Sequence, residues 1–122
     1  MTSVVTNTGL AIASNLISGL GGTTPKYLAH GTGAGTALVT DTALFSETSD
    51  GRTSGTMTRI TVTVTDDSVQ IVGTIIALST ETITNAGLFD ASTGGNLFYH
   101  TNFGSIALNE GDVITYTVTV TF

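Results

Sequence analysis

The chain has 122 residues, enough for one domain with a single core, and its net charge of −6 includes only 3 Lys and Arg residues. Binding to a run of phosphates requires several clustered cations, so the composition argues against nucleic-acid binding and against anionic membrane surfaces. Cysteine is absent, which excludes disulfides, cysteine-ligated zinc and thiol catalysis.

Charged residues are scarce. They make up 10% of the chain and hydrophobic residues 40%, whereas soluble domains carry about 25% charged residues. Threonine accounts for about a fifth of the sequence, and β-branched residues favour strands. A solitary monomer with so few charges would be poorly protected against association. We therefore expect many short strands in a homo-oligomer or in a component of a larger assembly.

No apolar run approaches the ~18 residues of a transmembrane helix. The N-terminal residues Met1 to Val4 lack the positive start and long apolar core of a signal peptide. The sequence therefore predicts cytoplasmic synthesis without export by that route, and no membrane partner.

Residues 7–20 contain the only predicted helix. Asn7 and Thr8 are residue types that cap a helix N-terminus, and glycines from Gly19 onward supply its end. A helix of about three turns must dock its apolar side on something. It packs either on its own sheet or, as part of a semi-independent arm of residues 1–24, on a neighbouring subunit. Its apolar positions are Leu10, Ala13, Leu16, Ile17 and Leu20.

Short strands separated by turn residues follow the helix. Asp66-Asp67 lies between two alternating runs, which predicts a hairpin. Residues 40–47 fit either a short strand or a turn of helix. With no helix between the strands, the pattern predicts one mainly β domain over residues 1–122, an antiparallel β-sandwich or jelly-roll-like fold with a short N-terminal helix or arm. The predicted strands cover residues 27–30, 56–65, 68–78, 82–90, 97–103 and 113–122.

Two of these strands alternate apolar residues with threonine. In the last strand, Ile114, Tyr116, Val118, Val120 and Phe122 share one face, and Thr115, Thr117, Thr119 and Thr121 share the other. The same pattern predicts a second threonine face made of Thr61, Thr63 and Thr65. Threonine costs far less to desolvate than a charge. These faces therefore suit burial against another protein as well as contact with water.

The residue patterns provide little support for catalysis. The glycine-rich stretch at residues 31–36 lacks the lysine of a phosphate-binding P-loop, so a flexible loop is expected. His30 and His100 are the only general-base candidates near neutral pH, and there is no Gly-x-Ser-x-Gly nucleophile motif. A small hydrolase would require His100 to converge with an acid in space. We predict no enzyme activity, no catalytic residue and no cofactor.

A metal site is not predicted either. The two histidines do not lie at metal-ligand spacing, and the acidic residues gather in turns, where Asp is an ordinary turn former. An EF-hand spacing for calcium is absent. These turn acids are Asp66, Asp67, Asp90, Glu110 and Asp112.

Residues 83–97, with the sequence ITNAGLFDASTGGNL, resemble a segment of small structural proteins of tailed bacteriophages. That segment combines a Gly-Leu-Phe-Asp strand with a glycine turn, and a threonine-rich terminal strand like residues 112–122 follows. Residues 27–33 and 40–44 look similar to the same group. The resemblance implies a virion protein, either a capsid decoration (cement) protein or a tail or fibre protein.

Two features favour decoration within that resemblance. The chain lacks the repeats of a fibre shaft, and an acidic, charge-poor protein suits many copies on a capsid exterior. The resemblance then implies trimers, made in the host cytoplasm, that bind the major capsid protein across subunit junctions and stabilise the head. The alternative is a tail, baseplate or fibre-tip protein that binds neighbouring tail proteins or a host receptor.

Exposed tyrosines are plausible contact residues in either role, because tyrosine joins an apolar face to a hydrogen-bonding tip. The predicted interface combines these tyrosines with the apolar helix positions, one histidine and the second threonine face. Its residues are Leu10, Leu16, Ile17, Leu20, Tyr27, His30, Thr61, Thr63, Thr65 and Tyr99.

Overall fold

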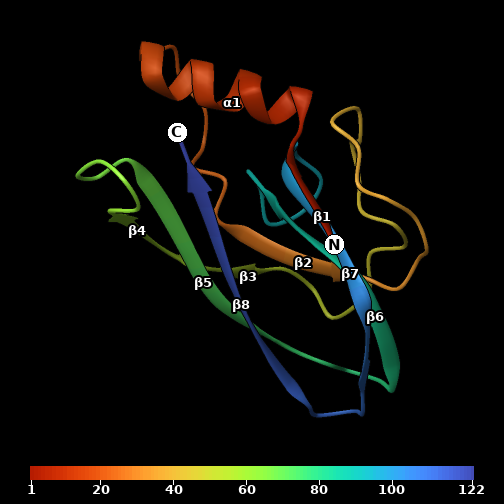
Figure 1. Cartoon of the computed structure of the whole chain (residues 1–122). Coiled ribbons are helices and arrows are strands. Elements are labelled where there is room, and N and C mark those ends of the chain that lie inside the picture. The colour runs from red at the N-terminus through yellow and green to blue at the C-terminus, as the bar shows by residue number, and fades with distance from the viewer.

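A computed structural model describes residues 1–122 as two antiparallel sheets with one helix beside them (Figure 1). The five-stranded sheet, sheet A, has the order β1-β7-β6-β2-β3, and the three-stranded sheet, sheet B, has the order β4-β5-β8. The predicted mainly β sandwich is confirmed. The elements are β1 (Thr2–Val5), α1 (Asn7–Ser18), β2 (Tyr27–Gly31), β3 (Thr53–Ser54), β4 (Thr56–Ile60), β5 (Ser68–Ile76), β6 (Glu81–Phe89), β7 (Leu97–Leu108) and β8 (Val113–Thr121).

The main core lies between the two sheets. The register places Leu28 of β2 beside Leu88 of β6, and Ile71 of β5 beside Val118 of β8. Because neighbouring residues in register point to the same face, each pair contributes to one inward-facing layer. These four side chains belong to a single buried cluster, which Ile12 of α1 closes at one end.

Strand β1 and helix α1 are fixed to sheet A. Strand β1 pairs with β7 along its whole length, so residues 2–5 form an edge of the sheet, which corrects the prediction of a semi-independent arm for this part of the chain. Thr6 caps α1: its Oγ1 accepts the Gly9 N–H at 2.9 Å and donates to the Leu97 carbonyl at 2.6 Å. The helix ends at Ser18, because Gly19 adopts a left-handed φ of 71°.

Gly9 marks the place where α1 meets β7. A Cβ at this position would lie 2.3 Å from the Phe98 carbonyl oxygen. Gly9→Ala is therefore expected to lower the free energy of unfolding by about 1–3 kcal/mol through overpacking, although the same change in a free helix would raise it. Thermal unfolding measures the effect. Gly104→Ala in β7 is the matched control, because an added Cβ there meets no atom within 4 Å; equal stability of the two variants would contradict the prediction.

Strand β4 is shorter than predicted. The antiparallel pairing of β4 with β5 confirms the hairpin, but β4 ends at Ile60 and residues 61–67 form a loop. The Asp67 carboxylate accepts the backbone N–H groups of Val62, Thr63 and Val64 at 2.9–3.0 Å. These hydrogen bonds take the place of strand pairing in residues 61–67, because they fold the backbone around one side chain. The prediction of a second threonine face on a strand is therefore wrong, since its residues lie in this loop.

The hydrogen bonds of Asp67 also make the stability of the folded chain depend on pH. The backbone N–H groups of Val64 and Val62, with the Ser68 hydroxyl, hold the pKa of Asp67 well below its ordinary value of 3.8. A lowered folded-state pKa contributes stability above the unfolded value, and this stability is lost as the pH falls. Asp67→Asn is therefore expected to destabilise the protein more at pH 7 than at pH 3, as measured by urea unfolding. Asp66→Asn is the matched control, because it changes an exposed neighbouring acid that accepts none of these three backbone N–H groups.

The long loop at residues 32–52 covers the outer face of sheet A (Figure 1). Leu44 from this loop packs with Ala29, Phe89 and Leu97 in a second buried cluster. Residues 40–47 form neither a strand nor a helix, and only Glu47 makes an isolated bridge to Gly31. The loop therefore acts as a third layer over the sheet. None of the structure's helices combines the length and apolar character needed to cross a bilayer.

Candidate functional site

The outer face of sheet B carries no charged side chain. Residues aligned by the strand register, such as Thr58, Gln70 and Thr119, point away from the core, and most of this face is exposed. The alternation predicted for the last strand is confirmed, because Val118 and Val120 are buried between exposed threonines. We call this surface the threonine face. It consists of Thr56, Thr58, Gln70, Val72, Thr74, Ile76, Val113, Thr115, Thr117, Thr119 and Thr121.

Strand β8 adds an open edge to the threonine face. It is the last strand of sheet B and pairs only with β5, so one side of its nine residues presents unpaired backbone groups. It contains no charged residue and no proline. Proteins usually protect such an edge with Lys, Pro or a bulge. An unprotected edge of this length is suited to pairing with a strand of another chain.

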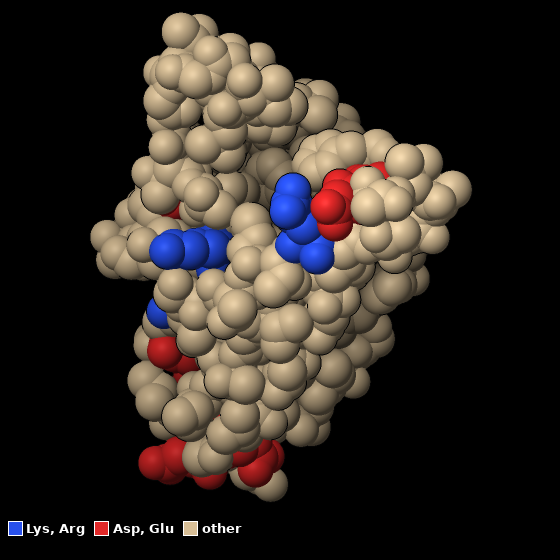
Figure 2. All heavy atoms as spheres, turned by 90° about the vertical axis from the view of Figure 1, so that its left-hand side faces the viewer, with Lys and Arg blue, Asp and Glu red and all other residues tan.

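Other parts of the surface are also poor in charge. Figure 2 shows one side of the molecule on which charged side chains gather at a few places and leave wide areas uncharged. On α1, Ile17 is 84% exposed, and Leu20 beyond its end is 82% exposed. Leu16 and Ile17 line a small apolar groove of about 140 Å³ together with Met57 of β4 and Phe122.

A larger cleft of about 320 Å³ opens between β8 and the β1–β7 edge of sheet A. Tyr99, Phe103 and Ile106 of β7 line one side of it, and Ile114 and Thr117 of β8 line the other. The edge of β8 is therefore bordered by apolar surface as well as by open backbone.

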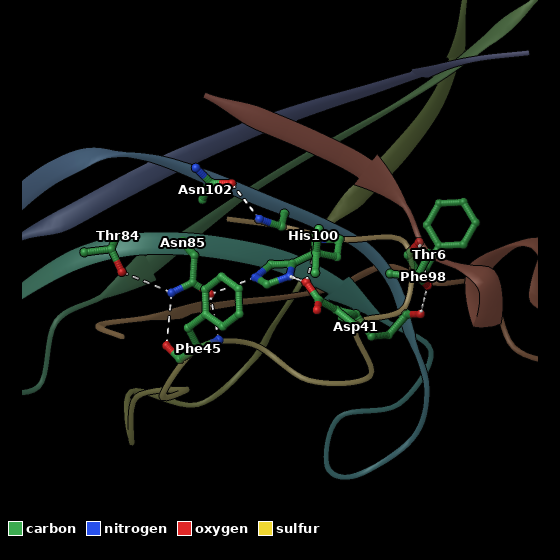
Figure 3. Close-up of polar contacts among 11 residues, drawn as sticks. Thr6, Asp41, Phe45, Thr84, Asn85, Phe98, His100 and Asn102 are labelled. Atoms are coloured by element: carbon green, nitrogen blue, oxygen red, sulfur yellow. Dashed lines mark hydrogen bonds and ion pairs between the residues drawn. The ribbon is translucent and has the colours of Figure 1, made fainter. Parts of the chain in front are cut away.

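His100 anchors the loop at residues 32–52 to the outer face of sheet A (Figure 3). Its Nδ1 lies 2.7 Å from Oδ2 of Asp41, and its Nε2 lies 3.0 Å from Oδ1 of Asn85. Asn85 also accepts the Phe45 N–H and donates to the Phe45 carbonyl, each at 3.0 Å. Both nitrogens of His100 thus face oxygen acceptors, and only a doubly protonated ring can donate to both.

The His100–Asp41 pair is enclosed where the loop at residues 32–52 covers sheet A. The His100 side chain is fully buried, and the Phe45 ring lies against it at a centroid distance of 4.7 Å (Figure 3). Its hydrogen-bond partners are a carboxylate and an amide, and no serine, threonine or cysteine nucleophile lies on either ring nitrogen. The convergence that the hydrolase hypothesis required does occur, but the arrangement holds a loop in place.

His30 belongs to a second buried cluster, located between the sheets. Its Nδ1 lies 2.9 Å from the Tyr116 hydroxyl, and its Nε2 lies 2.6 Å from Oδ2 of Asp50 and 3.4 Å from Oε1 of Glu81. Asp50 Oδ1 accepts the Leu78 N–H at 2.8 Å. The cluster therefore connects β2, the loop before β3, the start of β6 and β8.

Burial, hydrogen bonds and neighbouring charges together shift the pKa values in this cluster. Burial alone would raise the pKa of Asp50, but its contact with Glu81 and the hydrogen bonds from Leu78 and His30 outweigh burial and lower it. Burial, and then the neighbouring Asp50 carboxylate, raise the pKa of Glu81. Burial and the two carboxylates also raise the pKa of Tyr116. Of the two carboxyl groups, Glu81 is therefore the one that holds a proton more readily.

The structure separates the predicted interface residues. Leu10, Leu16, Ile17 and Leu20 are exposed around α1, Tyr27 and Tyr99 are half-buried, and Thr61, Thr63 and Thr65 are exposed in the loop after β4. His30 is 1% exposed, so a partner of the folded chain has no access to it. The predicted set therefore combines exposed, half-buried and buried residues.

No local sequence pattern indicates the partners of the two histidines. Asp41, Asn85 and Glu81 approach them only through the fold, and their spacing along the chain follows no ligand or catalytic pattern. The alternation in the last strand predicts its part of the uncharged outer face. Which residues of β4 and β5 belong to that face follows only from the strand register.

Comparison with known proteins adds one finding. The model of a family described as "Podophage GP4 fiber I protein gp80" matches residues 8–120. No curated protein and no solved structure matches the chain.

Proposed function

Since the chain belongs to the podophage GP4 fiber I protein gp80 family and is thus a phage virion structural protein, we propose that it is a component of the fibre. The observation that carries this proposal is the match itself, which extends over residues 8–120. The family description names a fibre protein, so the tail or fibre alternative is better supported than capsid decoration. A structural family also favours assembly over catalysis as the role of this chain.

The surface of the chain fits assembly with further copies of itself. The threonine face lacks charge, so two copies can bring their faces together without like-charge repulsion despite the net charge of −6. The β8 edge supplies unpaired backbone groups beside that face, and two such edges can pair antiparallel with each other. We therefore propose a homo-oligomer in which β8 and the threonine face are buried.

The location of the protein on the particle tests the proposal. Purified virions are labelled with an antibody against the chain and viewed by electron microscopy, and its copy number per particle is measured by quantitative mass spectrometry. A fibre component predicts label at the tail and a few tens of copies or fewer. Label over the head, with hundreds of copies, would support the capsid role instead and reject the fibre assignment.

A further inference from the structure

Three side chains with metal-binding groups meet between the two sheets. His30 comes from β2, Asp50 from the loop before β3, and Glu81 from the first position of β6. Their ligand atoms all lie within 4.8 Å of one another. The side chains of His30 and Asp50 are 0% and 1% exposed, and that of Glu81 is 9% exposed.

One carboxylate oxygen in this group has no partner. Oε1 of Glu81 is buried without a hydrogen bond, whereas buried polar atoms in folded proteins are nearly always satisfied. It lies 3.4 Å from Nε2 of His30, on the side where Asp50 also approaches. A cation placed among these three groups would satisfy the oxygen.

We propose that His30, Asp50 and Glu81 form a binding site for one divalent transition-metal cation of the zinc type. Imidazole nitrogen and carboxylate oxygen are both ligands of Zn²⁺, and two carboxylates with a neutral imidazole balance its charge. With bonds of about 2.0–2.1 Å, neighbouring ligands in a tetrahedral site are about 3.3 Å apart. The His30–Glu81 separation of 3.4 Å already fits, and the His30–Asp50 separation of 2.6 Å must widen.

Neighbouring groups orient the three ligands. When Nδ1 of His30 donates to the Tyr116 hydroxyl, Nε2 is left free to bind metal. The Leu78 N–H holds Oδ1 of Asp50, and Oδ2 therefore points toward the site. Calcium is a poor fit, because it prefers six to eight oxygen ligands. A bound zinc-type ion would join the loop before β3 to strands β2 and β6 of sheet A in a chain without disulfides.

Metal content and thermal unfolding of the full-length chain test the site. The protein is stripped with a chelator, dialysed against Zn²⁺ and analysed for bound metal. We expect one zinc per chain, and an unfolding temperature that rises on the order of 10 °C at a hundredfold excess of free Zn²⁺ over Kd. Co²⁺ in place of Zn²⁺ should give visible absorption bands from the coordinated ion.

Glu81→Gln identifies the ligand. The amide keeps the shape of the side chain but removes its charge, so the variant should fold yet lose the zinc-dependent rise in unfolding temperature. Two variants serve as controls and should retain the rise. Glu110→Gln changes an exposed acid in the turn before β8, and Asp41→Asn changes the acid beside His100.

The proposal is overturned if the wild-type chain binds no stoichiometric zinc and shows no zinc-dependent rise. It is also overturned if Glu81→Gln responds as strongly as the wild type, or if Ca²⁺ alone reproduces the effect. Should Glu81→Gln fail to fold, metal content and titration of the wild-type chain still decide the question. None of these results depends on where the protein sits on the virion.

Discussion

Replacement of Asn85 by alanine is expected to lower the free energy of unfolding by about 3–5 kcal/mol, because it would leave several buried polar groups without partners. The Asn85 side chain is the shared partner of the Phe45 N–H, the Phe45 carbonyl and the His100 ring. His100 is fully buried and Phe45 is half-buried where the loop at residues 32–52 covers sheet A. Urea unfolding followed by circular dichroism measures the change.

Asn15→Ala is the matched control for this prediction. Asn15 is exposed on α1, so its replacement should be neutral or slightly stabilising, since alanine is the better helix former. Hydrogen exchange adds a local readout: the Phe45 amide should exchange faster in Asn85→Ala. A loss of less than about 1 kcal/mol would show that the network is dispensable and that apolar contacts alone hold the loop.

The sequence predicted those parts of the fold that depend on local patterns. The alternation of Val118 and Val120 with threonines identified β8, and the acidic pair at Asp67 identified the β4–β5 hairpin. Both follow from the period-two geometry of a strand and from turn chemistry.

Sequence reasoning was less successful where one side chain organises a distant or irregular segment. The alternating threonines at residues 61–65 predict a strand, but the Asp67 carboxylate accepts hydrogen bonds from the backbone N–H groups of Val62, Thr63 and Val64 and holds this segment in a loop. The glycine-rich stretch predicts a flexible loop at Gly33, yet a Cβ there would lie 2.8 Å from the Phe45 backbone. The glycine therefore permits a close approach between two segments. Strand alternation encodes neither the local contacts of Asp67 nor the close approach of Gly33 to Phe45.

The buried polar clusters and the uncharged surface have different roles in this chain. His100 and His30 lie inside the fold, where they hold loops against the sheets, so the histidines are unavailable to a partner. In the proposed oligomer, recognition would therefore involve exposed groups such as the threonine hydroxyls and methyl groups and the β8 backbone. A surface of this kind favours an extended, repetitive contact over a single charged anchor, which agrees with a fibre protein.

The double substitution Thr117→Lys and Thr119→Lys is expected to weaken self-association by about tenfold or more, because it places like charges opposite each other in the buried interface. Both threonines lie in the middle rows of the threonine face, beside Val72 and Gln70 of β5. They are exposed in the single chain, so stability should change by less than about 0.5 kcal/mol. Light scattering coupled to gel filtration measures the oligomer across a concentration series.

Thr63→Lys with Thr65→Lys is the matched control. It adds the same charge to exposed threonines, but in the loop between β4 and β5, outside the paired rows of sheet B. This control should assemble like the wild type and enter phage particles during complementation, whereas the Thr117/Thr119 variant should be depleted from them. Normal assembly of the Thr117/Thr119 variant would remove the threonine face from the interface, and loss of assembly in the control would move the interface to the loop.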